Sequence, residues 1–456
     1  MTENPPPLVQ NMSTRLSAAA ATHRVPGASI ALHAGEILHE AACGVVNVDT
    51  GVEATTDALF HLASITKPMT TTMAMQFVDE GKLDLDAPVR RYLPDFRVAS
   101  EEAAGRMTVR QLLCHASGID GDLFIETTRG HDRLVKLVEA GRDLPQLHEP
   151  GQGFSYCNHG FAVAGRLFES LDGSDFDMIW RERISARLGV PSLLTLPEDA
   201  LRYRVAVGHA PSRSGPVVPK RMFLSTSAGP AGSTPMGRAR DLVWFALAHL
   251  DGGMARGGQR LVSGQGVRAM QQPHTALPSS APATHFGLGW MLFNWGDKPL
   301  FGHDGVSVFQ RSFLRVLPEK RMVFSLLTNG GDGAGLFRDL ASGFFGEAGA
   351  PMPPVPKPAE GTSIDARRFV GTYARFGTVT TVEEVDGALA MSSTWTEEWA
   401  RDLYGRLGPF ALKPVNDTLF VWRTPGAEPT LVTFTNEDGS GQFRSLYAGM
   451  RLSHRR

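Results

Sequence analysis

The sequence predicts an α+β domain, in which an antiparallel sheet is flanked by helices and joined to a helical subdomain, followed by a small all-β domain. The first observation is the order of elements: strand-like runs occur near both ends of residues 1–350, with a helix-rich middle between them. A sheet built from both ends of one segment is typical of the α+β class. The second observation is a proline-dense run at 351–361, after which short strand-like runs replace the helical pattern.

The first elements are a helix, a hairpin and a second helix. Residues 12–24 show amphipathic helical periodicity that ends at Pro26. The strand that begins this hairpin spans 28–32, and a run at 37–46 pairs with it. Residues 66–80 are apolar at helical spacing, and a glycine follows them as a plausible helix stop.

The middle of the domain is richer in helices, and strands return before the linker. Apolar residues recur at helical spacing in three segments, and strand-like runs mark three later ones. The helices therefore form a subdomain beside the sheet. The predicted helices span 109–115, 161–171 and 241–250, and the predicted strands span 286–293, 310–316 and 322–328.

A stiff linker separates two domains, predicted at 1–350 and 362–456. The linker, residues 351–361, is proline-dense, and such runs are extended. Turn pairs such as Asp386-Gly387 separate several short strands after it. This pattern predicts a small antiparallel β-barrel or sandwich. The strand-like runs span 379–385, 388–392, 419–422, 431–435 and 443–447.

Composition excludes several classes of partner. The formal net charge is -2, so no basic field attracts nucleic acid or anionic lipid. The three cysteines fit neither a disulfide framework nor a zinc motif, and we expect no metal and no cofactor. Residues 1–7 lack the regions of a secretory signal, and no run reaches the ~18 apolar residues of a membrane helix. We therefore expect a soluble, cytoplasmic protein without nucleic-acid or membrane partners.

The first chemical motif is S-x-x-K, formed by Ser64 and Lys67 at the start of a predicted helix. Residues three apart on a helix share a face, so the amine can reach the hydroxyl. A serine is a poor nucleophile unless a base takes its proton. A lysine is such a base only where burial or a nearby positive charge lowers its pKa. For an isolated match, an ordinary helix start with a solvated lysine is the preferred interpretation.

The second motif is Y-x-N, formed by Tyr156 and Asn158. A tyrosine near cations can share a network of lowered pKa values and pass protons. An asparagine amide can hold both the lysine and a substrate carbonyl. Taken alone, the segment would also suit a core tyrosine in a turn-rich stretch.

The third motif is the triplet His303-Asp304-Gly305. A short strand next to glycine lets a substrate backbone lie close to it, which makes Gly305 a candidate for substrate binding. His303 can donate a hydrogen bond to the substrate or to Tyr156. A metal role for His303 is a poor alternative because no second cluster has ligand spacing.

Together the three motifs identify a family resemblance. In their order S-x-x-K, Y-x-N, H-x-G, the chain resembles the superfamily of class C β-lactamases and low-molecular-weight DD-peptidases. That superfamily includes D-aminopeptidases, family VIII esterases and penicillin-binding-protein-type thioesterases. Flanking text agrees: residues 112–119 resemble the family segment LL-x-H-x-SG, and residues 287–290 read GLGW. The resemblance covers roughly residues 10 to 348 and implies a β-lactamase-like first domain.

The resemblance implies an acyl-enzyme at Ser64, with Lys67 and Tyr156 passing the proton. It also implies an oxyanion hole from the backbone N–H groups of Ser64 and Val306, and an acyl amide positioned by Asn158. One departure stands out. Many family members carry K-T-G at the third motif, whereas this chain has His303 there. The departure argues against strong β-lactamase activity and fits esterases, D-aminopeptidases and thioesterase-like cyclases better.

The C-terminal domain resembles the lipocalin-like barrel of some of these enzymes. In penicillin-binding-protein-type thioesterases, an arginine near the chain's end is thought to hold the C-terminal D-residue of the peptidyl substrate. The resemblance implies the same role for an arginine at the matching place in this chain. Arg451 stands at the matching place. It could equally be a solvated terminal arginine.

Three hypotheses of function follow. The first is a serine hydrolase or acyltransferase acting on esters or amides, with D-residue-containing peptides as the expected substrates. The second is a thioesterase that macrocyclises a nonribosomal peptide delivered by a peptidyl carrier protein. The third is a non-catalytic sensor that keeps the fold, and the intact set of Ser64, Lys67 and Tyr156 argues against it.

Overall fold

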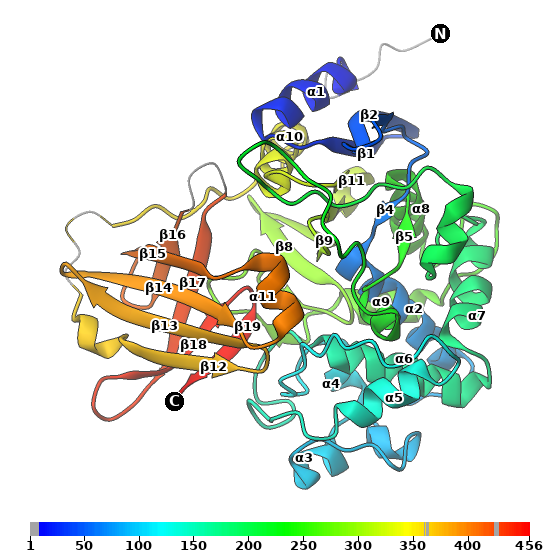
Figure 1. Cartoon of the computed structure of the whole chain (residues 1–456). Coiled ribbons are helices and arrows are strands. Elements are labelled where there is room, and N and C mark those ends of the chain that lie inside the picture. The colour runs from blue at the N-terminus through cyan, green and yellow to red at the C-terminus, as the bar shows by residue number, and fades with distance from the viewer. Residues whose placement is uncertain (1–8, 360, 362–363, 424–427) are drawn as a thin grey trace.

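The computed structural model describes residues 9–359, 361, 364–423 and 428–456, so the N-terminal residues 1–7 considered above lie outside it. A mixed helix and sheet domain and an all-β domain lie beside each other (Figure 1). Within the described residues, none of the helices combines the length and apolar character that crossing a bilayer requires.

The first domain is built on a nine-stranded antiparallel sheet, which confirms the predicted fold class. The N-terminal hairpin pairs with the last strand of the domain: β1 and β11 lie side by side in the order β3-β2-β1-β11-β10-β9-β8-β7-β6. Both ends of the segment therefore contribute to one sheet, as the order of elements predicts. The strands are β1 Gly27–Ala34, β2 Ile37–Asn47, β3 Val52–Glu53, β6 Thr275–Ala276, β7 His285–Phe286, β8 Met291–Trp295, β9 Lys298–Val306, β10 Arg311–Leu317 and β11 Met322–Thr328.

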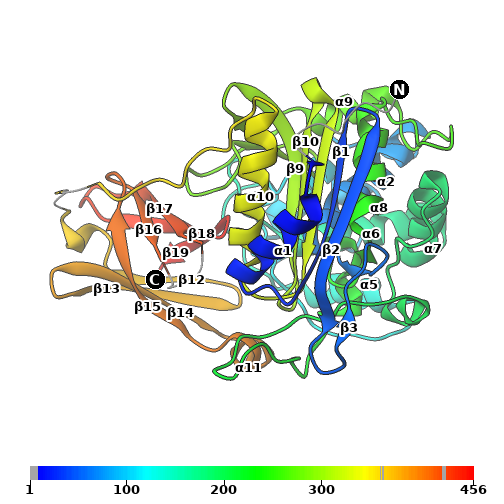
Figure 2. The same ribbon diagram turned by 90° about the horizontal axis from the view of Figure 1, so that it is seen from above.

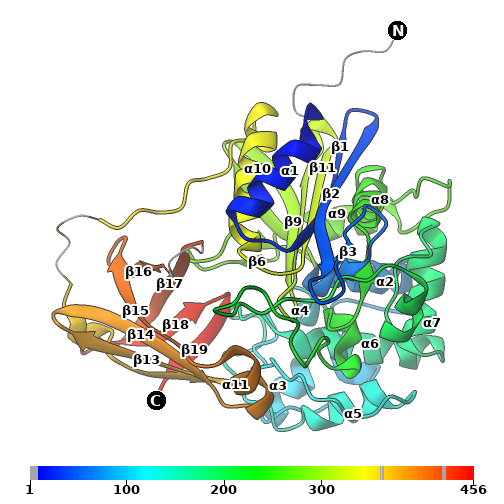
Figure 3. The same ribbon diagram turned by 45° about the horizontal axis from the view of Figure 1, so that its top comes forward.

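Helices cover both faces of this sheet (Figure 2). Alternate residues of β1 bury toward opposite sides, because Ile30 joins the cluster that contains α1 and α10 while Ala31 joins the cluster that contains α2 and α8. The helical subdomain lies beyond α2 (Figure 3). The helices are α1 Met12–Thr22, α2 Thr66–Asp79, α3 Glu101–Arg106, α4 Val109–Leu113, α5 Arg133–Ala140, α6 Asn158–Asp172, α7 Phe176–Trp180, α8 Ala239–Leu250, α9 Gly264–Gln271 and α10 Gly333–Glu347.

The predicted strand at 286–293 is interrupted, and the interruption has a physical reason. Gly289 adopts φ 74°, which breaks the extended backbone between β7 and β8. A Cβ at this position would collide with the side chain of Thr71 on α2. The glycine turn therefore packs directly against α2, the helix that carries Lys67. This helix is buried from Thr66 to Phe77.

The second domain is a closed eight-stranded barrel, which decides between the barrel and the sandwich. Three of its strands, β12, β15 and β19, were not predicted, nor was the helix α11 Glu398–Tyr404. Aromatic side chains fill the interior: Phe369, Tyr373, Phe420, Phe434 and Phe443. The strands are β12 Gly371–Arg375, β13 Thr378–Val385, β14 Ala388–Trp395, β15 Leu407–Pro414, β16 Leu419–Trp422, β17 Thr430–Glu437, β18 Phe443–Ala448 and β19 Arg451–Arg455.

Candidate active site

Ser64 lies in a tight turn that leads into the central helix. The 3₁₀ turn Ala63–Ile65 runs directly into α2, whose first turn carries Lys67. The Lys67 Nζ lies 3.1 Å from the Ser64 Oγ. It also lies 2.7 Å from the Asn158 Oδ1 and 2.6 Å from the backbone oxygen of Ala231. The spacing of S-x-x-K thus brings the two groups together as expected.

The surroundings of Lys67 favour its neutral form. Burial lowers the pKa of Lys67 well below its usual range, the Arg451 guanidinium lowers it further, and the Asp122 carboxylate opposes them only in part. A neutral amine donates two hydrogens and accepts one. The two carbonyl oxygens at Asn158 and Ala231 can only accept, so the lone pair is left for the Ser64 hydroxyl. This geometry suits a base that takes the serine proton.

The turn that presents Ser64 is strained and tightly held. Ala63 adopts φ 48°, a left-handed conformation that costs energy for a residue with a Cβ. Two glycines press against this turn. Gly232 packs on the Ala63 backbone, and Gly305 of β9 packs on Leu62 and Ala63. Gly305 therefore has a structural reason to be glycine, besides the predicted approach of substrate.

Replacing Gly305 with alanine is expected to displace the turn. The new Cβ would lie closer than 3.0 Å to the Ser312 Oγ, the Leu62 backbone oxygen and the Ala63 Cβ. Overpacking of this kind costs about 1–3 kcal/mol of unfolding free energy. Thermal unfolding of G305A measures it, and Gly257→Ala is the control because a Cβ there meets nothing within 4 Å. Equal melting temperatures for the two variants would contradict the expectation.

Tyr156 lies buried beside Lys67. The Lys67 Nζ lies 4.8 Å from the centroid of the Tyr156 ring, which stacks on His115 with centroids 4.0 Å apart. Burial raises the pKa of Tyr156, and the nearby Ser64 hydroxyl and the Arg451 charge lower it only in part. Tyr156 is therefore a neutral phenol in the free protein. This corrects the expectation of a lowered pKa, since the cost of burying a phenolate outweighs the cations.

Asn158 connects Lys67 to a carboxylate that the sequence did not reveal. Its Oδ1 accepts from Lys67, and its Nδ2 donates to the Asp122 Oδ1 at 2.7 Å. An ammonium or amine on one side and a carboxylate on the other fix the orientation of the amide. One Nδ2 hydrogen remains for a substrate carbonyl.

Arg451 lies in this site, and its side chain is only partly exposed. Its Nε and Nη2 donate to Asp122, the latter at 3.2 Å, and its Cζ lies 4.9 Å from the centroid of the Tyr156 ring. Arg375 of β12 donates to the same Asp122 at 3.0 Å. Burial would raise the pKa of Asp122, but Arg451 and Arg375 lower it to about 2. The carboxylate is therefore ionised between two arginines of the barrel.

The barrel also supports the backbone around Tyr156. The turn between β18 and β19 passes through Gly449 and Met450, both with positive φ. The Met450 oxygen accepts from the Tyr156 N–H at 3.0 Å. The Tyr447 hydroxyl donates to the Phe154 oxygen at 2.7 Å. The barrel is thus part of the wall of the site.

His303 is buried in β9 and presents an acceptor, where we expected a donor. Its Nδ1 lies 2.6 Å from the backbone oxygen of Asp304. Because a carbonyl only accepts, the proton sits on Nδ1 and Nε2 carries a lone pair. Burial lowers the pKa of His303 to about 3, with a further contribution from Lys67, so the ring is neutral. Among the described residues Nε2 has no partner.

The backbone N–H of Val306 faces the open side of β9. Ser307 donates to Gln310 across the hairpin, so the Ser307–Gln310 pair is hydrogen-bonded. Hydrogen-bonded and non-hydrogen-bonded pairs alternate in an antiparallel ladder. Val306 and Arg311 therefore form a non-hydrogen-bonded pair, and the Val306 amide points away from β10. On that side β8 pairs only as far as Gly302, which leaves the amide accessible to a ligand.

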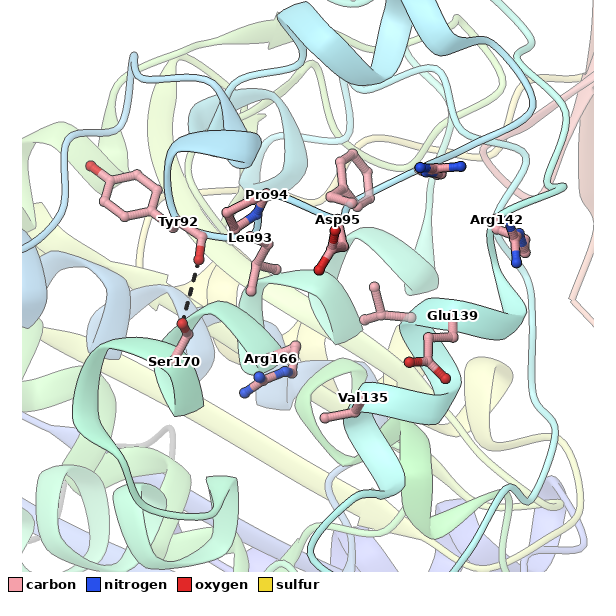
Figure 4. A pocket seen from close by; sticks show the side chains of 12 residues that line it. Tyr92, Leu93, Pro94, Asp95, Val135, Glu139, Arg142, Arg166 and Ser170 are labelled. Carbon is pink, nitrogen blue, oxygen red and sulfur yellow. Dashed lines mark hydrogen bonds between the residues drawn. The ribbon is translucent and has the colours of Figure 1, made fainter.

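A pocket elsewhere on the surface lacks this chemistry. A pocket of about 510 Å³ lies on the helical subdomain (Figure 4) and is lined by arginine, carboxylate and apolar side chains. Its one serine, Ser170, donates to the backbone oxygen of Tyr92. None of the residues predicted for the site lines it.

Comparison with known proteins places this site in a family. The chain belongs to the Beta-lactamase family, whose model matches residues 12–342. This is a family of β-lactamase-fold serine hydrolases. The chain is 42% identical over 369 residues to "Penicillin-binding protein 4" of Amycolatopsis lactamdurans, across 80% of this chain and 97% of that protein.

Solved structures match either almost the whole chain or about three quarters of it. The crystal structure of SurE matches with a TM-score of 0.75 at 29% identity, over 98% of this chain and 99% of SurE. SurE with D-Leu gives a TM-score of 0.71 at 27% identity, with the same coverage. The D-amino acid amidase from Ochrobactrum anthropi SV3 complexed with D-phenylalanine gives 0.63 at 25% identity, over 75% of this chain and 99% of the amidase.

Proposed function

We propose that the protein forms an acyl-enzyme at Ser64. Lys67 takes the Ser64 proton as the Oγ attacks the substrate carbonyl, and the N–H groups of Ser64 and Val306 hold the resulting oxyanion. When the bond to the leaving group breaks, the proton passes to that group through Lys67 or the Tyr156 hydroxyl. A water or an amine then attacks the ester, and Ser64 recovers its proton. The observation that supports this most is the contact of a buried Lys67 Nζ with the Ser64 Oγ at 3.1 Å.

The acyl residue of the substrate is D-configured in this proposal. The fold is similar to that of SurE, solved with D-Leu, and to that of a D-amino acid amidase, solved with both D- and L-phenylalanine. The D-Leu complex and the amidase's name support that choice. The side chain of Arg451 uses three of its five N–H donors, on Asp122 and on the Gly449 oxygen. The other two have no partner among the described residues and can hold the acyl end of a peptide. His303 contributes an acceptor for a substrate N–H.

A second candidate is macrocyclisation, in which the peptide's own amine replaces water as the acceptor. The feature that favours it is the barrel, which places Arg451 against Tyr156. A barrel wall beside the acyl-enzyme would hold a long peptide and limit the entry of water. In that case a peptidyl carrier protein would deliver the acyl chain as a thioester.

The experiment that decides is product analysis by mass spectrometry. The protein and a Ser64→Ala variant each receive a peptidyl thioester with a free N-terminus and D-leucine at the acyl end. A linear acid from the wild type alone supports hydrolysis, and a cyclic product from the wild type alone supports macrocyclisation. Turnover that is equal in the two proteins would refute acylation at Ser64. A complete absence of turnover and of acyl adduct would instead favour the non-catalytic sensor.

A further inference from the structure

A chain of polar contacts runs from the nucleophile to the barrel through Asp122. Ser64 contacts Lys67, Lys67 contacts Asn158, and Asn158 donates to Asp122. Asp122 then accepts from Arg451. Arg375 reaches the same carboxylate from β12, which pairs with β19, the strand of Arg451, in the closed barrel.

The Asn158 amide is held from both sides. Lys67 favours one orientation, because its lone pair faces Ser64 and it can only donate to Asn158. Asp122 holds the same orientation from the other side, since an ionised carboxylate can only accept. With Asp122 present, the Asn158 Nδ2 faces the carboxylate and its Oδ1 faces the amine. An Asn at 122 could not satisfy both Asn158 and the two arginines, because it would turn a donor toward one of them.

Asp122 also balances charge around Lys67. Positive charge comes from Arg451, with Arg375 behind it, and Asp122 is the carboxylate that acts on Lys67. Three titratable groups beside Lys67 are neutral: burial lowers the pKa of His115 and His303, and raises that of the Cys157 thiol to about 12. Two further carboxyls lie near this set: Asp120, whose pKa burial raises to about 6, interacts with Arg375 and Asp122, and Asp304 is paired with Arg315. Removing one member of the Asp122 and arginine set therefore changes the net charge beside Lys67 by one unit.

We infer that Asp122 is a positioning residue: clamped by Arg375 and Arg451 of the barrel, it holds the Asn158 amide and sets the charge balance beside Lys67. The inference rests on the proposed acylation at Ser64. It assigns the barrel a function in the chemistry, because both arginines come from barrel strands. Aromatic side chains fill the interior of the barrel. We therefore expect the barrel to act through residues of its strands and turns that face the first domain.

The inference predicts that the low-pH limb of the acylation rate moves in opposite directions when Asp122 and when either arginine is replaced. Acylation needs neutral Lys67, so its rate falls at low pH as Lys67 is protonated. Asp122→Asn removes a negative charge, lowers the pKa of Lys67 and moves this limb to lower pH. Arg451→Met or Arg375→Met removes a positive charge that offsets the Asp122 carboxylate. The pKa of Lys67 therefore rises, and the low-pH limb moves to higher pH. Removing a close charge shifts a pKa by on the order of one unit.

The test measures the acylation rate of Ser64 against pH by intact-protein mass spectrometry, with a peptidyl thioester that ends in D-leucine. Asp122→Asn should lose on the order of 10²-fold in the rate at its optimum, because Asn158 is misplaced. Arg375→Lys should restore most of what Arg375→Met loses. The control is Arg338→Met, which breaks a 2.8 Å ion pair between the first domain and Glu428 of the barrel, away from Ser64.

The possible outcomes separate the inference from the proposed function. A wild type that never acylates at Ser64 overturns both. If the wild type acylates but the low-pH limbs of D122N and R451M stay in place or move in the same direction, the inference alone is overturned. If D122N fails to fold, the comparison of Arg375→Met with Arg375→Lys still decides, because only a charge effect is rescued by lysine. If R338M loses as much of the acylation rate as R375M, the contacts of Asp122 with the arginines only dock the two domains, and the inference is overturned.

Discussion

Ser64→Ala is expected to abolish turnover, with a loss on the order of 10⁶-fold in kcat, as for removal of a catalytic serine elsewhere. The Ser64 Oγ is the nucleophile next to the buried amine of Lys67, and alanine offers no atom to acylate. Stability should change little, since one hydroxyl is removed and Lys67 keeps its contacts to Asn158 and Ala231. Steady-state kinetics on an activated ester of a D-amino acid, together with thermal unfolding, measure both.

The control for this variant is Ser170→Ala, which removes a hydroxyl of α6 far along the helix from Asn158. It should keep wild-type kcat. Retention of more than a hundredth of wild-type kcat by S64A would show that another group performs the chemistry.

Lys67→Met is expected to have the second largest effect, a loss on the order of 10⁴-fold, the upper end for removal of a general base. The methionine fills the volume but cannot take the proton from Ser64. It also leaves the Asn158 Oδ1 and the Ala231 oxygen without their donor, and each buried unpaired acceptor costs about 1–3 kcal/mol. We therefore expect a lower melting temperature as well as lost activity.

Acylation kinetics and thermal unfolding of K67M test this pair of effects against Lys82→Met. The Lys82 side chain is half exposed and, within the part of the chain that the structure describes, forms an ion pair with Glu80 alone, so its loss should change neither quantity much. A K67M variant that acylates at near the wild-type rate would leave Tyr156 as the base.

The sequence predicts the catalytic constellation because its members stand in short, ordered motifs. Helical spacing alone brings Lys67 to Ser64, and the family order of motifs adds Tyr156, Asn158 and His303 from distant segments. The fold class follows from the order of strands and helices, and the structure confirms it. The protonation details were less accessible. The predicted donor role of His303 was wrong. Its Nδ1 hydrogen is already bonded to the Asp304 carbonyl, and this contact depends on the folded backbone.

Asp122 and Arg375 could not be found in the sequence. Asp122 stands in Gly118-Ile119-Asp120-Gly121-Asp122, a stretch that reads as a turn. Arg375 is one arginine among many on a barrel whose strand β12 was itself not predicted. Only the docking of the barrel, through contacts separated by more than 200 residues in the chain, brings them together. The position of Arg451 is a partial exception, since the family resemblance offered the site as one of its two interpretations.

The most direct test of the central claim is to trap the acyl-enzyme. The protein is incubated with a peptidyl thioester ending in D-leucine, quenched in acid, digested and mapped by mass spectrometry. We predict an adduct of the acyl group on the peptide that contains Ser64, present in the wild type and absent from Ser64→Ala. An adduct on another residue, or turnover of the thioester without an adduct on Ser64 even after rapid quenching, would contradict the account.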